Sequence, residues 1–436
     1  MRLIVSFDSV GQTVVVKLNR SPAPVDGINQ GRTVRIGALR GANARARGEE
    51  LVKLLGRHAP VKQALTMALA QPPVAPPQPI YLRVVADVAD ALPWEQLYWK
   101  AQGFLALDPR WPVGRIAAVE YDVNPRSYLA PFRIVAVLSA AQREGSSQLE
   151  ALASAVADAR ARKLDVKLHV ITGEQAVHDR VATLGNKNVT CEWIGAWTDR
   201  VVQQIADAKP SILHMLCHGD NSAGVRGLRL ASQPDFLGQA DAGSVPLSLG
   251  ELARALSLCD PWLVVLAACE TAGVTETSGA FARGLVDKGI PAVIGMRRLV
   301  DLAAMNRFAD VLYPEVLTTV EVALRPDPHD PVRTIDWITT LTAPRRAAIV
   351  GVDPAQDDAW SDPVLYAQQD LLQVYVPTKQ RMSAREYALA VGKIDTWVVY
   401  RRGLDPGTTP AEVLAEIDAK IAELRAQLPD EPERDG

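Results

Sequence analysis

Two short apolar runs, each ending in a reactive side chain, constrain the possible fold and function of this chain most. Residues 211–218 (SILHMLCH) end in His218, and residues 262–269 (WLVVLAAC) end in Cys269. Each run has the length and aliphatic content of a strand that is buried on both faces of a parallel sheet. Parallel strands end at one edge of the sheet, where open α/β sheets place their sites. If the two strands are neighbours, His218 and Cys269 lie side by side, as a cysteine nucleophile and its base require.

The region from residue 132 onward alternates between strand and helix patterns. The predicted strands cover residues 132–138, 166–171, 211–219, 262–269 and 291–296. The predicted helices between and after them cover residues 148–162, 199–208, 249–258, 279–288 and 303–317. Five strands separated by helices predict an α/β fold with a mostly parallel, doubly wound sheet, right-handed crossovers and helices on both faces. The two runs with reactive ends are its third and fourth strands.

The two ends of the chain have patterns of their own. Residues 1–24 alternate like a β-hairpin with Gly11 near its turn, and residues 44–70 have helical spacing. A proline-rich spacer follows over residues 71–79, and residues 410–428 form an amphipathic helix pattern. We therefore expect three parts: a small N-terminal β/α region with its linker (1–79), the α/β domain (80–376) and a C-terminal helical extension (377–436).

Composition and charge exclude several classes of protein. The 436 residues include 47 basic and 50 acidic side chains, a net charge of −3, so we expect no direct nucleic-acid partner. The sequence shows no long apolar run and no signal-peptide pattern, which predicts no membrane association. Its four cysteines lack C-x-x-C spacing, which argues against a disulfide framework or a zinc site and favours the reducing cytoplasm. We expect neither a metal nor a cofactor.

The chemistry of a cysteine nucleophile needs more than the thiol. It needs a nearby imidazole and backbone N–H groups that face the developing oxyanion. Gly219, directly after His218, lets the backbone approach a substrate, and the amide of Cys269 can point into the same site. An isolated cysteine at the end of an apolar strand is more often a packed core residue. The placement of both residues at the ends of consecutive strands favours the catalytic interpretation.

Longer stretches around both runs resemble a known family. Residues 213–220 (LHMLCHGD) and 263–272 (LVVLAACETA) are similar to the CHAT group of caspase-like cysteine peptidases. Further similar segments follow the same order as in that family: residues 92–98 (LPWEQLY), 103–107 (GFLAL), 289–296 (GIPAVIGM), 308–313 (FADVLY) and 360–366 (WSDPVLY). The resemblance extends over roughly residues 80–370 and implies a caspase-like fold.

The resemblance also implies an activity. It implies a cysteine endopeptidase in which Cys269 is the nucleophile and His218 the base, with the amides of Gly219 and Cys269 as oxyanion donors. Members of this family commonly work in partner-regulated bacterial defence or signalling, so the resemblance suggests a protein substrate and a role such as antiphage defence. An activating protein partner would dock on the N-terminal region or the C-terminal helix.

Three further side chains are candidates for substrate binding. They are Asp220, Glu270 and Arg297. Metacaspase-type enzymes have an aspartate two residues before the nucleophile, whereas this chain has Ala267, which puts a preference for basic substrate residues in doubt. Glu270 could equally be a solvated turn residue. Arg297, with Arg298 beside it, either binds an acidic substrate group or caps the sheet edge.

Two residues next to the site are expected to be structural. Strand alternation points Cys217 to the face opposite His218, and places His214 on the same face, below the site. We expect both to be buried in the core.

Two other kinds of protein compete with the peptidase. One is a catalytically silent caspase-like interaction module, because a sequence cannot show that the two residues are aligned. The other is a nucleotide- or cofactor-binding protein with a doubly wound sheet. The loop after the first strand of the sheet, residues 138–145 (LSAAQREG), matches neither G-x-G-x-x-G nor a P-loop, which disfavours that class.

Overall fold

The chain folds into two compact units. The computed structural model describes residues 2–10, 13–70, 72, 75–117, 125–220, 227–238, 243–268, 271, 273, 280–299, 301–325, 332–376, 384–405 and 409–426. One unit comprises Met1–Leu324 and Thr334–Val374, and the other comprises Arg325–Arg333 and Tyr375–Gly436. Within these described ranges, no helix is both long and apolar enough to cross a membrane.

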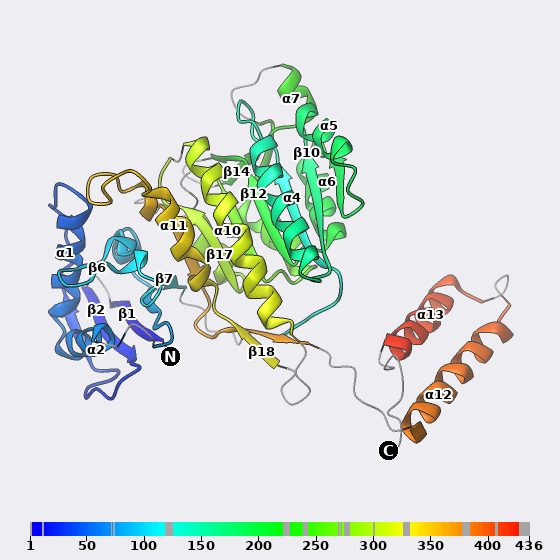
Figure 1. Ribbon diagram of the computed structural model, residues 1–436, viewed down its shortest axis with the longest axis horizontal. Coiled ribbons are helices and arrows are strands. Elements are labelled where there is room, and N and C mark those ends of the chain that lie inside the picture. Colours follow the sequence, from blue (N-terminus) through cyan, green and yellow to red (C-terminus); the bar gives the residue numbers. More distant parts are fainter. Residues whose placement is uncertain are drawn as a thin grey trace. The chain divides into compact units, whose positions relative to one another are not determined.

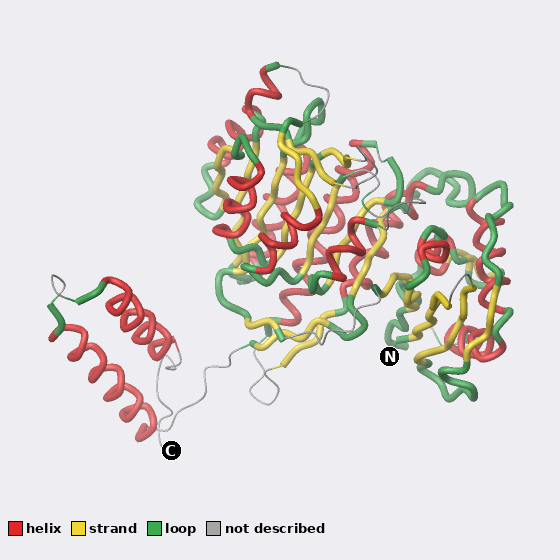
Figure 2. Tube along the Cα trace, turned by 180° about the vertical axis from the view of Figure 1, so that it is seen from behind, coloured by secondary structure: helices red, strands yellow, loops and turns green. Residues whose placement is uncertain are grey.

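A 12-stranded sheet forms the centre of the first unit (Figure 1; its strands are yellow in Figure 2). In order across the sheet, the strands are β11 (Val189–Trp193), β10 (Val166–Thr172), β9 (Phe132–Leu138), β12 (Ile212–Leu216), β16 (Leu263–Ala267), β17 (Ala292–Met296), β19 (Pro363–Ala367), β7 (Val113–Ile116), β4 (Ile80–Val84), β1 (Leu3–Val10), β2 (Thr13–Arg20) and β3 (Gly31–Val34).

Shorter strands lie outside this sheet. β13 (His218–Asp220), β14 (Gly227–Leu230) and β15 (Val245–Ser248) form a small antiparallel sheet, and β5 (Tyr98–Trp99) pairs with β6 (Gly103–Phe104). The remaining short strands are β8 (Arg126–Ser127), β18 (Val332–Ile335) and β20 (Leu372–Tyr375).

The helices connect and cover the strands. They are α1 (Ala44–Gly56), α2 (Ala59–Leu69), α3 (Asp87–Asp90), α4 (Ser146–Ala161), α5 (Gln175–Leu184), α6 (Thr198–Ala208), α7 (Gln233–Leu237), α8 (Leu249–Ser257), α9 (Phe281–Asp287), α10 (Leu302–Ala323), α11 (Thr342–Ala348), α12 (Ala384–Gly403) and α13 (Ala411–Ala426). Single 3-10 turns cover Trp94–Gln96, Leu105–Leu107, Trp337–Leu341 and Ala359–Ser361.

The predicted α/β sheet is confirmed. The five predicted strands are β10, β9, β12, β16 and β17, which lie next to one another in this order. Each strand is parallel to its neighbour. Their long apolar runs are buried on both faces, as parallel strands between two layers of helices must be. On the far side of β17 the sheet continues with β19, which is antiparallel to β17. The added edge strand β11 and the preceding helix α5 were not predicted.

Helices cover both faces of the central strands. His214 on β12 faces α4 and α10, which lie side by side in Figure 1: its Nε2 donates to Gln148 Oε1 at 2.6 Å, and its ring meets the Tyr313 ring edge-on. The flanking residues Leu213 and Met215 point to the opposite face, where they share an apolar core with α6, α8 and α9. The sheet is therefore doubly wound, as predicted.

The strand predicted to run to Gly219 ends earlier. β12 stops at Leu216, and His218 begins β13, which pairs antiparallel with β14. After Cys217 the chain leaves the main sheet, and residues 218–220 pair with β14 instead. The prediction that His214 and His218 lie on the same face of one strand is therefore wrong, since the two residues belong to β12 and β13.

The helix predicted over residues 44–70 is two helices. α1 ends at Gly56 and α2 begins at Ala59, with Pro60 in its first turn. Proline lacks an N–H group and clashes with the preceding turn, so it starts a helix but does not continue one.

The N-terminal strands join the main sheet. β1 and β2 form the predicted hairpin, and β1 also pairs in parallel with β4. Gly11, predicted near the hairpin turn, lies outside the described residues. Strands from before and after the proposed linker (residues 71–79) thus belong to the same sheet. The division into residues 1–79, 80–376 and 377–436 stays a prediction.

The second unit contains a helical hairpin. α12 and α13 pack against each other, with Ile394, Ile417 and Ile421 buried and Arg401 Nε 2.9 Å from Asp418 Oδ1. The predicted C-terminal helix is confirmed as α13, whereas α12 was not predicted.

His214 makes the stability of the fold sensitive to acid. Burial lowers the pKa of its imidazole to about 3, whereas the unfolded chain binds this proton below about pH 6.5. Between these two pH values the folded state binds fewer protons than the unfolded state, so stability falls as the pH falls. We expect this one group to remove about 2 kcal/mol of the unfolding free energy between pH 7 and pH 5.

Urea unfolding at both pH values measures this effect. His214→Gln should lose less stability on acidification than the wild type, by about 2 kcal/mol. His178→Gln, at a half-exposed position on α5, is the matched control and should behave like the wild type. Equal pH dependence of His214→Gln and the wild type would contradict this account.

Candidate active site

The ends of β12 and β16 lie at the same edge of the sheet. The two strands are parallel neighbours, and Leu216 pairs with Ala267. His218 follows Leu216 by two residues, and Cys269 follows Ala267 by two residues. The two chain segments therefore leave the sheet in register. Cys269 lies outside the described residues.

His218 is held through one ring nitrogen. Its Nε2 lies 2.6 Å from the carbonyl oxygen of Ala141, in the loop after β9. Because a carbonyl oxygen only accepts, Nε2 carries the proton and donates it. In the neutral ring, Nδ1 is then the basic nitrogen, and the half-buried imidazole can exchange a proton through it.

A tight turn directs the Ala141 carbonyl. The Arg143 amide donates to the Ala140 carbonyl at 3.1 Å, which closes a β-turn over residues 140–143. Gln142, at the third position, has φ of 57°, whereas Ala141 has a negative φ. This combination defines a type II turn, whose central peptide is flipped relative to a type I turn. The turn conformation therefore sets where the Ala141 carbonyl points.

Ser139 fixes the start of this loop. It is fully buried, and its amide donates to the Leu216 carbonyl at 2.9 Å. Its hydroxyl donates to the Ala231 carbonyl and accepts from the Gly173 amide at 3.0 Å. These bonds tie the loop that holds His218 to the ends of β10, β12 and β14.

Thr271 fixes the chain on the far side of Cys269. Its side chain is buried, and its Oγ1 donates to the Ala268 carbonyl at 3.1 Å and accepts from the Met296 amide at 3.0 Å. Its own carbonyl accepts from the Ala282 amide at 2.8 Å. The residue thereby joins the ends of β16 and β17 to the start of α9.

The candidate substrate-binding side chains have different surroundings. Asp220 on β13 forms an ion pair with Arg229 on β14 at 2.9 Å. Arg297, directly after β17, lies 3.5 Å from Asp362 Oδ1, and burial lowers the pKa of its guanidinium. Both follow strands that end at the edge where His218 lies, and both have an ionic partner within the chain. Glu270 lies outside the described residues.

The remaining predicted residues fall where expected. Cys217 and His214 are buried, with 2% and 1% of their surface exposed, so the prediction that both are core residues is confirmed. Gly219 lies exposed on β13, beside His218.

Sequence reasoning missed Ala141, Ser139 and Thr271. Ala141 contributes a backbone carbonyl, which any residue supplies, so its identity carries no signal. Thr271 stands in the stretch that resembles the CHAT group, but its partner Met296 comes from another strand. A sequence alone does not show that pairing.

Comparison with known families identifies the class. The CHAT domain family matches residues 45–330, more than half of the chain. The chain therefore belongs to the CHAT domain family. The match begins at α1, upstream of the similarity recognised from the sequence.

Two solved structures are similar to this chain at low identity. The Arg-specific cysteine proteinase gingipain R has a TM-score of 0.41 and 12% identity, with 79% of this chain and 71% of that chain covered. The Saccharomyces cerevisiae separase–securin complex has a TM-score of 0.35 and 10% identity, with 74% of this chain and 17% of that chain covered. No curated protein in the comparison matches the chain.

Proposed function

We propose that this chain is a cysteine endopeptidase in which Cys269 is the nucleophile and His218 the acid–base group. The observation that carries the proposal is the register of β12 and β16, in which Leu216 faces Ala267 and the two reactive residues follow at equal steps. Membership of the CHAT domain family supports it. So does the fixed orientation of His218, whose Nε2 is bonded to Ala141 and whose Nδ1 remains for proton transfer.

The proposed reaction runs in two stages. Nδ1 of His218 takes the proton of the Cys269 thiol. The resulting thiolate attacks the scissile carbonyl, and the amides of Gly219 and Cys269 stabilise the oxyanion. His218 protonates the leaving amine through Nδ1, while the Ala141 carbonyl keeps the ring oriented and accepts from Nε2 throughout. A water molecule then hydrolyses the thioester and returns its proton to Nδ1.

Substrate choice and regulation are part of the same proposal. Asp220, Glu270 and Arg297 would line the site, but Asp220 and Arg297 must exchange their ion pairs with Arg229 and Asp362 to bind a charged substrate group. We further propose a protein substrate in a cytoplasmic bacterial defence or signalling system. An activating partner would dock on the N-terminal region or on the C-terminal helices.

A thiol-directed peptidyl electrophile tests this proposal. Mass mapping of the labelled protein should find Cys269 modified faster than Cys191, with His218→Ala slowing the reaction at Cys269 alone. If Cys269 reacts no faster than Cys191, the chain is a catalytically silent interaction module and the proposal fails.

Thr271→Val should slow the labelling of Cys269 by about 10- to 100-fold, because small displacements of a reacting group have effects of that size. The substitution keeps the shape of the side chain but removes the bonds of its hydroxyl to Ala268 and Met296. The Met296 amide then stays buried without its partner, at a cost of about 1–3 kcal/mol in stability. Thr271→Ser keeps the hydroxyl and is the matched control. Equal labelling rates for both variants and the wild type would contradict a positioning role.

A further inference from the structure

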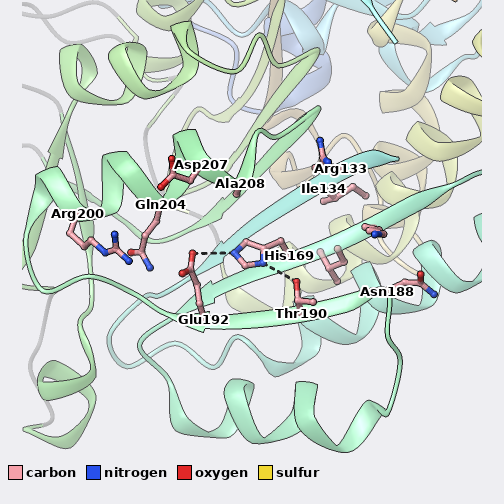
Figure 3. A pocket seen from close by; sticks show the side chains of 12 residues that line it. Arg133, Ile134, His169, Asn188, Thr190, Glu192, Arg200, Gln204, Asp207 and Ala208 are labelled. Atoms are coloured by element: carbon pink, nitrogen blue, oxygen red, sulfur yellow. Dashed lines mark hydrogen bonds and ion pairs between the residues drawn. The ribbon is translucent and has the colours of Figure 1, made fainter. Parts of the chain in front are cut away.

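A cavity lies away from the edge that carries His218. It has a volume of about 340 Å³ and lies between β9, β10, β11 and α6 (Figure 3). This volume is at the lower end of pockets that hold small molecules, which span about 300–1,000 Å³. Its lining residues on β9 and β10 belong to the first halves of those strands, whereas His218 follows the end of β12.

Two basic side chains leave the floor of this cavity side by side. Arg133 on β9 pairs in register with Lys167 on the parallel neighbour β10, so both side chains point to the same face. Like charges on directly paired strand positions repel each other and destabilise the sheet. An anion bound between them would remove that repulsion.

A third basic side chain lines the opposite end. Arg200 of α6 stands across the cavity from Arg133, with His169 between them (Figure 3). Among the described residues, no carboxylate lies within ion-pair distance of Arg133, Lys167 or Arg200. The cavity therefore presents three cations that have no direct ion-pair partner in the described part of the chain.

The two carboxylates that line the cavity bond to other side chains. Glu192 Oε1 accepts from His169 Nε2 at 3.1 Å, and His169 Nδ1 lies 2.9 Å from Thr190 Oγ1. Asp207 Oδ1 accepts from Gln203 Nε2 at 2.7 Å. Neither carboxylate neutralises the Arg133–Lys167 pair.

We infer that this cavity binds a small phosphate monoester, with the phosphate between Arg133 and Lys167 and the rest of the molecule extending toward Arg200. A phosphate monoester near pH 7 carries a charge of about −1.5 to −2, which matches two adjacent cations, whereas a carboxylate carries one. Arg133 contributes a planar fork of donors and Lys167 a point charge, a combination suited to phosphate oxygens.

Isothermal titration of the full chain with three probes tests this inference. Adenosine 5′-monophosphate and inorganic phosphate should bind, whereas adenosine should not. The double variant Arg133→Gln/Lys167→Gln should bind adenosine 5′-monophosphate at least about tenfold more weakly, because each charge-assisted contact is worth that much or more. Lys100→Gln, at an exposed position between β5 and β6, is the matched control and should bind like the wild type.

Thermal unfolding separates ligand binding from a structural role. Without anion, the double variant should melt at or above the wild-type temperature, because the repulsion between Arg133 and Lys167 is gone. With added phosphate, only the wild type and Lys100→Gln should gain stability. The inference is overturned if neither phosphate probe binds, if adenosine binds as tightly as its monophosphate, or if Lys100→Gln loses as much affinity as the double variant. A double variant that melts below the wild type without anion also overturns it, since the pair is then structural.

Discussion

Cys269→Ala should abolish cleavage of the protein substrate, with a loss in rate of about 10⁴-fold or more. Without the thiol no thioester forms, and only substrate binding and the two backbone amides, at positions 219 and 269, remain to assist direct attack by water. The substitution adds no charge and removes little volume, so the variant should fold like the wild type. A comparison of new protein N-termini in cells that express the wild type or Cys269→Ala measures the loss and names the substrate.

Cys191→Ala is the matched control for that comparison. Cys191 is a thiol on the edge strand β11, and its loss should leave every cleavage in place. Cleavages that persist in Cys269→Ala, or that vanish in Cys191→Ala, would contradict the assignment of the nucleophile.

Arg115→Met should lower the unfolding free energy by about 3–5 kcal/mol, because it leaves the buried Glu95 carboxylate without its cation, whereas Asp90 keeps its ion pair with Arg283. Arg115 on β7 is fully buried, as are the side chains of its partners. Its guanidinium lies 2.9 Å from Asp90 Oδ1 and 2.8 Å from Glu95 Oε2. Burial alone would raise the pKa of the Glu95 carboxyl, but the charge and hydrogen bonds of Arg115 lower it below its ordinary value.

The stability lost in Arg115→Met should depend on pH. In Arg115→Met, burial acts on Glu95 without the compensating cation, so the folded-state pKa of this carboxyl rises above its unfolded value. The stability of the variant should therefore recover in part as the pH falls toward about 5, since the folded state then binds the extra proton. Glu95→Gln in the same background should also recover part of the loss at neutral pH.

Urea unfolding measures both effects, with a surface pair as control. Arg160 and Asp165 form an ion pair at 3.0 Å with both side chains partly exposed. Arg160→Met should cost less than about 1 kcal/mol. If Arg115→Met lost no more unfolding free energy than Arg160→Met, the buried network would not hold β7 in place.

The fold was predictable where one physical signal dominates. The buried runs at residues 132–138 and 291–296 are too apolar for anything but the interior of a sheet, and they are β9 and β17. β13 was missed because a three-residue strand depends on its partner β14, and its own sequence says little. β19 was missed as a strand because its residues were assigned to a motif rather than to a pattern of burial.

The site was predictable to a different degree. The side chains proposed to carry the chemistry, His218 and Cys269, stand out by residue type and by their position after apolar runs. The groups that orient them do not. The Ala141 carbonyl acts through a turn conformation, and Thr271 acts through a bond to Met296 on another strand. Both interactions join residues that are far apart in the sequence and meet only in the folded chain, so the sequence alone does not predict them.

The most direct test of the proposed dyad is the pH dependence of alkylation at each cysteine by iodoacetamide, read by mass spectrometry between about pH 5 and pH 9. Burial, with the nearby Glu192 charge, raises the pKa of the Cys191 thiol to about 11, and burial raises that of Cys259 to about 12, so both should react slowly throughout this range. Cys269 should react readily near neutral pH, and His218→Ala should shift its profile to higher pH. A Cys269 profile that matches that of Cys191, and that His218→Ala leaves unchanged, would contradict the account.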